Sequence, residues 1–155
     1  SVQSGMIAGD DHLVNEIKTY SLFRTYRCSP MTLFELQETV LKYINKQEKE
    51  IPFWNLITQP YSSLEDRCKN IAKSISFSTS IEKGESVIGG GTLPDVTLES
   101  PILLINNEKT VDTVNQLIKN DIPIVPRIIK DQVCLDLRSV FHNQDDIIVQ
   151  ALNNS

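Results

Sequence analysis

The sequence predicts an α+β fold with an antiparallel sheet and helices on one face. Apolar residues follow a helical spacing through the first half of the chain, and from residue 76 the spacing changes towards the two-residue period of strands. Two apolar runs within residues 122–140 flank a polar tip, Lys130-Asp131-Gln132, which indicates a β-hairpin. The predicted order is a series of helices followed by β-β-β-α-β-β-α.

Two helices are predicted before residue 50. Asp10 and Asp11 are suitable N-caps for the first, which continues with apolar residues at helical spacing. Thr32 and Glu35 form the capping-box pattern of the second helix, which extends to about Lys46. The apolar stripe of that helix consists of Leu33, Leu36, Val40, Leu41 and Ile44.

The middle of the chain predicts a short helical turn and a longer helix. Residues 52–57 form the turn, in which we expect Trp54 to anchor the two halves of the chain together. Ser62 or Ser63 is expected to cap the longer helix. Its inner face consists of Leu64, Cys68, Ile71 and Ala72.

The second half of the chain supplies the predicted sheet. Strands are expected at residues 76–81, 85–93 and 101–105, before the two strands of the hairpin. A run of three glycines, 89–91, interrupts the second strand and predicts a bulge or an interface strand, because no Gly-Lys-Ser/Thr ending follows to form a phosphate loop. Helices are expected at residues 110–119 and 143–153. The inward residues of the first of these are Val111, Val114, Leu117 and Ile118.

Composition limits the classes of function. The net charge of −5 over 155 residues argues against a free-standing nucleic-acid binder, because phosphate contacts require clustered Lys and Arg. No apolar run reaches the length of a membrane span. Cys28, Cys68 and Cys134 are odd in number and lack metal-ligand spacing, so we expect reduced thiols and a cytoplasmic location.

The beginning of the chain predicts a piece of a larger fold. Residues 4–8 have the composition of a strand, and a helix follows at once. A lone strand leaves its backbone donors and acceptors without partners, so we expect it to be disordered or to pair with another chain.

Arg24 and Arg27 are the first candidates for ligand contact. They lie three residues apart in a segment without helical or strand periodicity, and two guanidinium groups can form a fork for a phosphate or a similar oxyanion. The alternative is a pair of solvated surface arginines, which the spacing alone favours.

Arg127 is the second candidate, because it lies inside an apolar run of the hairpin. It is expected either to bind a carboxylate or phosphate, or to form an ion pair with Asp136 or Asp131 across the hairpin. Asp136 and Arg138 are expected to be structural.

No self-contained catalytic centre is predicted. His12 and His142 are far apart in sequence and have no Cys or carboxylate at ligand spacing, which argues against a metal site. The sequence contains neither Gly-x-Ser-x-Gly nor another context that suggests a Ser-His-Asp set.

Several motifs, in order, resemble one family. Residues 3–9, Gln-Ser-Gly-Met-Ile-Ala-Gly, and residues 21–27, Ser-Leu-Phe-Arg-Thr-Tyr-Arg, are similar to Gln-Ala-Gly-Ile-Ile-x-Gly and Pro-Leu-x-Arg-Ala-x-Arg. Residues 89–94 and the pieces Pro-Arg-Ile and Leu-Asp-Leu-Arg-Ser-Val of the hairpin resemble Gly-Gly-Gly-Ser-Leu-Pro and Gly-Arg-Ile…Leu-Asp-Leu-Arg-Thr-Val. These motifs, with the helix that begins near Met31, are typical of bacterial L-seryl-tRNA(Sec) selenium transferases (selenocysteine synthases).

The resemblance implies a C-terminal fragment of a pyridoxal-phosphate (PLP) enzyme of the aspartate-aminotransferase type. Residues 1–30 would be a trailing strand and helix of the PLP-binding large domain. Residues 31–155 would be the C-terminal small domain, with a linking helix at 32–46. The lysine that binds the cofactor would lie outside the fragment, which is then expected to bind no cofactor and to be inactive alone.

The resemblance also implies substrates and contacts. The full-length enzyme would convert seryl-tRNA(Sec) to selenocysteinyl-tRNA(Sec) with selenophosphate, as a homo-oligomer without membrane contact. Arg24 and Arg27 would bind the selenophosphate phosphate, and Gln3 would contact the cofactor. Arg127 occupies the small-domain position that related PLP enzymes use for a substrate carboxylate, which in this family is esterified to tRNA.

The chain departs from the family pattern at four residues. Pro126 and Asp95 stand where glycine is common, and Ser1-Val2 replaces Gly-Pro. The alternatives are a related PLP-dependent lyase or transferase that acts on a small amino acid or sugar acid, and a non-catalytic oligomerisation module.

Overall fold

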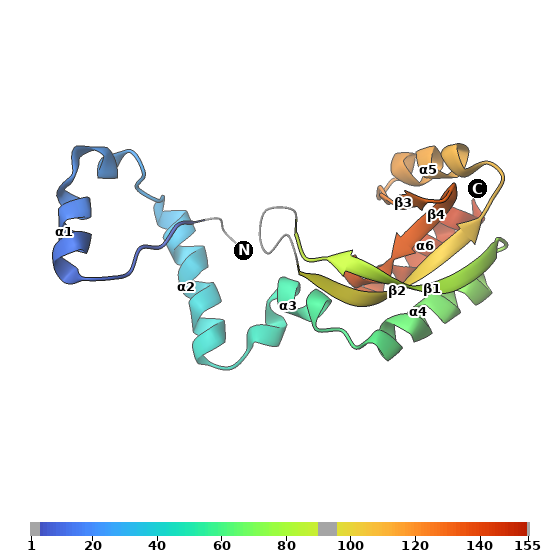
Figure 1. Cartoon of the computed structure of the whole chain (residues 1–155), viewed down its shortest axis with the longest axis horizontal. Coiled ribbons are helices and arrows are strands. Elements are labelled where there is room, and N and C mark those ends of the chain that lie inside the picture. Colours follow the sequence, from blue (N-terminus) through green and yellow to red (C-terminus); the bar gives the residue numbers. More distant parts are fainter. Residues whose placement is uncertain (1–3, 90–95, 155) are drawn as a thin grey trace. The chain divides into compact units, whose positions relative to one another are not determined.

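The computed structural model describes residues 4–89 and 96–154, and the chain divides into two compact units (Figure 1). The first unit is Ser1–Ile51 and the second is Pro52–Ser155. The predicted domains, 1–30 and 31–155, refer to the fold of a longer protein, and that boundary stays a prediction. The anchoring role expected of Trp54 also stays a prediction.

The first unit is helical in its described part. Its elements are α1 (Asp11–Thr19), a 3₁₀ turn η1 (Ser21–Arg24), α2 (Pro30–Ile44) and a 3₁₀ turn η2 (Glu48–Glu50). The strand expected at residues 4–8 is not formed, since these residues are neither helix nor strand. A strand requires a hydrogen-bonded neighbour, and the described part of this unit contains no other strand.

The two helices begin at polar caps, one as predicted and one not. The carboxylate of Asp10 accepts a hydrogen bond from the backbone N–H of His12 at 2.8 Å, which confirms the first N-cap. The capping box predicted at Thr32 is wrong: Ser29 is the N-cap and accepts from the N–H of Thr32 at 3.1 Å. Pro30 occupies the first helical position, where its missing N–H costs nothing and its fixed φ fits the helix.

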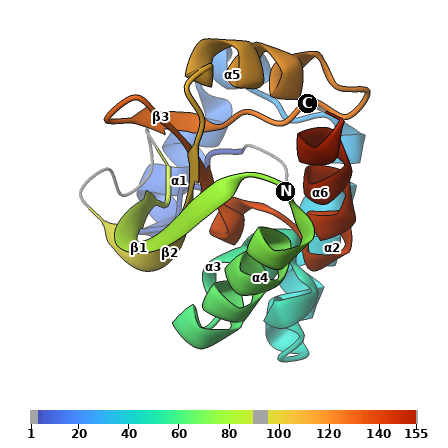
Figure 2. The ribbon, with the colours of Figure 1, turned by 90° about the vertical axis from the view of Figure 1, so that its right-hand side faces the viewer.

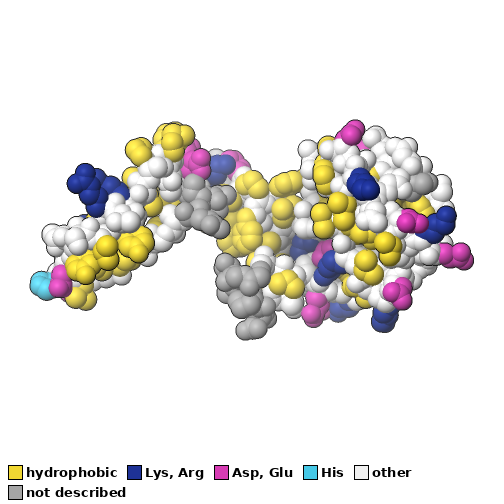
Figure 3. Space-filling view, turned by 90° about the horizontal axis from the view of Figure 1, so that it is seen from above, with side chains coloured by type: hydrophobic (Ala, Val, Ile, Leu, Met, Phe, Trp, Pro, Cys, Tyr) yellow, Lys and Arg dark blue, Asp and Glu magenta, His cyan; other side chains and the backbone are white. Residues whose placement is uncertain are grey.

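The second helix also ends before the predicted Lys46. Its last helical residue is Ile44, and Lys46 has φ 57°, in the left-handed region in which helices often terminate. The residues of the predicted apolar stripe lie in this helix, but most of them are exposed to solvent. Leu33, Val40, Leu41 and Ile44 are between 40% and 69% exposed. Figure 3 shows apolar side chains at the surface of the helical unit.

The second unit is an α+β domain built on one antiparallel sheet. Its helices are α3 (Pro52–Ile57), α4 (Tyr61–Ser74), α5 (Thr110–Lys119) and α6 (Asp145–Asn153), with 3₁₀ turns η3 (Leu137–Ser139) and η4 (His142–Gln144). Its strands are β1 (Ser78–Val87), β2 (Thr97–Asn106), β3 (Arg127–Ile129) and β4 (Gln132–Asp136). They lie in the order β1-β2-β4-β3, and each neighbouring pair is antiparallel. The predicted fold class is therefore confirmed at the level of an α+β domain with an antiparallel sheet.

The predicted strand order is wrong by one strand. Residues 78–81 and 85–87 of the two predicted strands belong to a single strand, β1. Residues 88 and 89 are not in a strand, and residues 90–93 lie outside the described residues. The polar residues between the two predicted strands continue the strand because β1 is an edge strand, which can expose them to water. Gly84 keeps β1 close to β2, because a Cβ at this position would lie 2.5 Å from Cγ1 of Ile102.

The predicted hairpin is confirmed. Lys130 and Asp131 form its two-residue turn with φ values of 50° and 61°, the positive values of a type I′ connection. Gln132 belongs to β4 and pairs with Ile129. Arg127 lies directly opposite Cys134 in this register.

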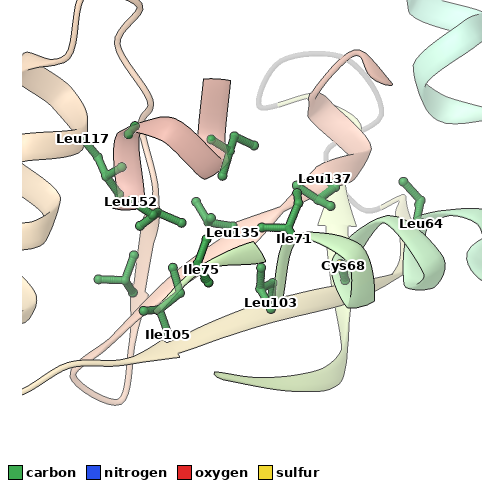
Figure 4. Packing of buried hydrophobic residues seen from close by; sticks show 13 residues of the cluster. Leu64, Cys68, Ile71, Ile75, Leu103, Ile105, Leu117, Leu135, Leu137 and Leu152 are labelled. Atoms are coloured by element: carbon green, nitrogen blue, oxygen red, sulfur yellow. The ribbon is translucent and has the colours of Figure 1, made fainter. Parts of the chain in front are cut away.

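The core lies between one face of the sheet and three helices, α4, α5 and α6 (Figures 2 and 4). Alternate residues of β2 and β4 point to this face, among them Leu103, Ile105, Val133 and Leu135. α4 and the residue that follows it contribute Leu64, Cys68, Ile71 and Ile75, α5 contributes Leu117, and α6 contributes Ile148, Ala151 and Leu152. The helices therefore cover one face, as the sequence predicted.

Three details of the helix predictions differ from the structure. Pro60 precedes α4 as its N-cap, so neither Ser62 nor Ser63 caps it. Val111 and Ile118 of α5 are 66% and 44% exposed, because Thr113 rather than either of them is buried with Leu117. Only part of the apolar residues of this short helix can face the core, and the others stay at the surface. Within the described ranges, no helix combines the length and the hydropathy required to cross a bilayer.

Candidate functional site

Arg24 and Arg27 lie in the tight connection between α1 and α2. The backbone of this connection turns through hydrogen bonds from Thr25 N to Leu22 O at 2.9 Å and from Tyr26 N to Phe23 O at 3.2 Å. Both arginines are exposed. Among the residues that the structure describes, neither guanidinium group makes a hydrogen bond or an ion pair, so their donors remain available to a ligand.

The N-terminus of α2 lies next to Arg27 in sequence. Ser29 is the cap of this 15-residue helix, two residues after Arg27. The N-terminal end of a helix carries a partial positive charge. The connection therefore combines a neighbouring helix N-terminus with two guanidinium groups that have no partner in the described part of the chain. All of these groups favour an anion.

Arg127 forms the ion pair that the sequence left open as an alternative. Its Nη2 lies 3.3 Å from Oδ2 of Asp136, and its Nη1 donates to the carbonyl of Glu85 at 3.3 Å. The Arg127 side chain is nevertheless 45% exposed. These contacts use two of the five N–H groups of the guanidinium within the described ranges.

Asp136 is held by donors from several elements. Its Oδ1 accepts from the hydroxyl of Ser100 at 2.8 Å and from the backbone N–H of Arg138 at 3.1 Å. Its Oδ2 accepts from the hydroxyl of Ser86, in addition to Arg127. The carboxylate therefore has enough neutral donors to stay in place, and it fixes the orientation of Arg127.

Two other arginines of the second unit are buried and structural. Arg67 forms a bidentate pair with Asp145, at 3.0 Å from Nε to Oδ2 and 2.7 Å from Nη2 to Oδ1. It also donates to Gln59 Oε1 and to the carbonyls of Leu137 and Val140. The sequence analysis missed this residue, although its place three residues after Leu64 on α4 is a signal that could have found it.

Arg138 connects three segments of the second unit, as expected of a structural residue. It donates to the carbonyls of Ile57 and Gln59 at 3.0 Å each and to that of Glu99 at 2.6 Å. Its side chain is 7% exposed, and its Nε has no hydrogen-bond partner among the described residues.

A cavity of about 650 Å³ lies in the second unit beside Arg127 and Arg138. Its wall is mainly apolar, and it includes Phe53, Leu98 and Val125. The charged side chains of its lining are two arginines and one carboxylate, Arg127, Arg138 and Asp136. This lining has a net positive charge, which favours a ligand with an anionic group and an apolar body.

The cysteines are placed for packing. Burial raises the pKa of the Cys68 thiol to about 12, and the thiol lies 3.8 Å from the carbonyl of Pro101. Burial also raises the pKa of Cys134. Cys28, in the first unit, is half-buried. All three are free thiols.

Other predicted features are not brought together. Gln3 and most of the glycine-rich segment, from Gly90 to Asp95, lie outside the described residues. His12 and His142 are both exposed and belong to different units. The described part of the chain contains no group of three His, Cys, Asp or Glu side chains suited to a metal ion.

Comparison with known proteins identifies a family for this chain. Residues 1–141 match the family described as SelA: L-seryl-tRNA selenium transferase. The chain is 31% identical over 160 residues to an L-seryl-tRNA(Sec) selenium transferase of Clostridium perfringens, an alignment that covers 97% of this chain and 34% of that protein. It is 29% identical over 153 residues to the Campylobacter jejuni protein of the same name, with 99% and 34% covered.

The chain thus spans about a third of the length of the curated relatives that it matches. This agrees with the C-terminal fragment that the motifs predicted. Because the family match extends over more than nine-tenths of the sequence, the chain belongs to the L-seryl-tRNA selenium transferase family.

Proposed function

We propose that this chain is the C-terminal part of a PLP-dependent enzyme that converts seryl-tRNA(Sec) to selenocysteinyl-tRNA(Sec) with selenophosphate. The observation that carries this proposal is the family match over residues 1–141. The relatives' names give a seryl-tRNA substrate and a selenium transfer. Neither a small-molecule PLP enzyme nor a non-catalytic module has comparable support.

Arg24 and Arg27 are the residues of this chain that we assign to selenophosphate. Their donors have no partners among the described residues, and their planar groups suit a tetrahedral oxyanion. The neighbouring N-terminus of α2 adds positive potential. These arginines would bind and orient the phosphate group while selenium leaves it.

The cofactor contacts belong largely to the part of the enzyme that this chain does not cover. PLP, when bound, supplies an electron sink for loss of the serine hydroxyl. Gln3, for which we propose a contact with the cofactor, lies outside the described residues. We place the lysine that holds PLP in the remaining two-thirds of the protein, and we expect a cytoplasmic homo-oligomer.

The direct test is selenium transfer by the full-length protein. Purified enzyme loaded with PLP is expected to form selenocysteinyl-tRNA from seryl-tRNA and selenophosphate, and the 155-residue chain is expected to form none. Lack of transfer by the loaded full-length enzyme would contradict the proposed reaction.

A second test concerns the cofactor alone. The 155-residue chain mixed with PLP is expected to develop no stoichiometric absorbance band of a lysine-bound cofactor. A band that borohydride abolishes would show that a lysine of this chain holds PLP, against the assignment above.

A further inference from the structure

The cavity in the second unit is the feature that the selenophosphate assignment leaves without an occupant. Its volume of about 650 Å³ is within the range of small-molecule sites. It belongs to the second unit, whereas Arg24 and Arg27 belong to the first. The assignment of Arg24 and Arg27 to selenophosphate therefore does not account for this cavity.

The charges of the lining indicate an anion. Arg127 is 45% exposed and uses only two of its donors within the described ranges. Arg138, also in the lining, keeps a buried Nε without a hydrogen-bond partner among the described residues. Because that Nε is buried, the spare donors that a ligand in the cavity can reach are those of Arg127.

The rest of the lining indicates a flat apolar body. Phe53 is 45% exposed and forms an edge-to-face pair with Trp54, at 5.4 Å between ring centroids, so its ring is supported. Val125, 80% exposed, is another apolar residue of the same wall. Unpaired nucleotides in RNA are typically bound by stacking of the base on an aromatic ring and by contact of the phosphate with arginine.

We propose that this cavity binds the 3′-terminal nucleotide of the substrate tRNA, with the phosphate at Arg127 and the base against Phe53. This inference rests on the proposed function, which supplies the tRNA. Aminoacylated tRNA carries its amino acid on the terminal adenosine, so the enzyme must place that nucleotide close to the reacting serine. Asp136 is a positioning residue, because it holds the Arg127 guanidinium through its Nη2.

The first experiment uses adenosine 5′-monophosphate (AMP) as the probe on the 155-residue chain, followed by backbone amide NMR shifts. AMP is expected to shift the amides of Leu98 and Val125. Arg127→Gln is expected to weaken binding by about tenfold or more, because a charge-assisted hydrogen bond is lost. Phe53→Ala is expected to weaken it several-fold. Lys73→Gln, which removes an exposed cation of α4 outside the cavity, is expected to leave it unchanged.

Comparing AMP with adenosine and with inorganic phosphate shows whether both the base and the phosphate contribute to binding. Adenosine and inorganic phosphate are each expected to bind more weakly than AMP. Adenosine binding equal to AMP binding would overturn the role of Arg127. The absence of AMP shifts in the cavity, or equal affinity of all variants, would overturn the site and leave the cavity as a surface for another protein segment.

The second experiment uses the full-length enzyme and distinguishes this inference from the proposed function. Phe53→Ala is expected to raise KM for seryl-tRNA and to leave KM for selenophosphate unchanged. If the enzyme is active and neither Phe53→Ala nor Arg127→Gln changes its KM for seryl-tRNA, the cavity does not bind the terminal nucleotide, and the proposed function still stands. An enzyme that transfers no selenium would defeat the proposed function, whatever the result with AMP.

Discussion

The two units use arginine in opposite ways. In the first unit, Arg24 and Arg27 are exposed and, within the described ranges, have no partner. In the second unit, Arg67 and Arg138 are 4% and 7% exposed, and their donors bind carbonyls and carboxylates of distant segments. A buried guanidinium that donates to several distant segments stabilises the fold, whereas an exposed one without partners can bind a ligand. Arg127 is intermediate, with one ion pair and spare donors.

The largest effect on stability is expected at Arg67. Arg67→Met leaves Asp145, a carboxylate that is only 18% exposed, without its partner, so we expect the free energy of unfolding to fall by about 3–5 kcal/mol. Urea unfolding of the 155-residue chain measures this change. Lys69→Met is the matched control, because it removes a cation from the same helix whose pair with Glu65 is exposed. Equal unfolding midpoints for the two variants would contradict the structural role of Arg67.

Arg138 is expected to have the next largest effect. Arg138→Met leaves three backbone carbonyls, of Ile57, Gln59 and Glu99, without this donor. The cost of leaving partly buried acceptors without a donor predicts a loss of about 1–3 kcal/mol in the free energy of unfolding. A variant as stable as the parent chain in urea would show that water replaces the guanidinium at no cost.

Arg127 is expected to contribute little to stability. Its ion pair with Asp136 is long, at 3.3 Å, and its side chain is nearly half exposed. Arg127→Gln is therefore expected to change the free energy of unfolding by about 1 kcal/mol or less. A loss as large as that of Arg138→Met would place Arg127 among the structural arginines and weaken its assignment to a ligand.

The cysteines of the two units are also expected to differ, in their reactivity towards a thiol reagent. The thiolate is the reactive form of cysteine, and a pKa of about 12 keeps the Cys68 thiol protonated even at about pH 9, where an ordinary thiol is half ionised. We expect a thiol reagent to modify Cys28 rapidly, and Cys68 and Cys134 only after denaturant is added. Mass spectrometry of the modified peptides measures the order. Fast labelling of Cys68 in the folded chain would contradict a stable core in the second unit.

Much of the fold could be predicted because local patterns determine it. The helix at 110–119 and the hairpin at Lys130-Asp131 were predicted from apolar spacing and a polar tip, and both formed. The start of α2 was predicted wrongly because Thr32 and Glu35 matched a capping box, while Ser29-Pro30 offered a better start three residues earlier.

The candidate sites could be predicted only in part. The pair Arg127–Asp136 was one of two alternatives, since the two residues lie across a hairpin. The other partners of Asp136 could not be predicted, because Ser86 and Ser100 lie 50 and 36 residues away in sequence. Arg67 was missed for a similar reason: Asp145 is 78 residues away, and only the tertiary fold brings the two together.

The central claim is that Arg24 and Arg27, the exposed arginines between α1 and α2, bind the selenium donor. In the full-length enzyme, Arg24→Ala and Arg27→Ala are expected to lower turnover at limiting selenophosphate by about tenfold or more each, because a charge-assisted hydrogen bond to phosphate is lost. The thermal midpoint is expected to stay unchanged, and Lys18→Ala, an exposed cation of α1, is expected to turn over normally. Unchanged turnover in both arginine variants, or an equal loss in Lys18→Ala, would contradict the claim.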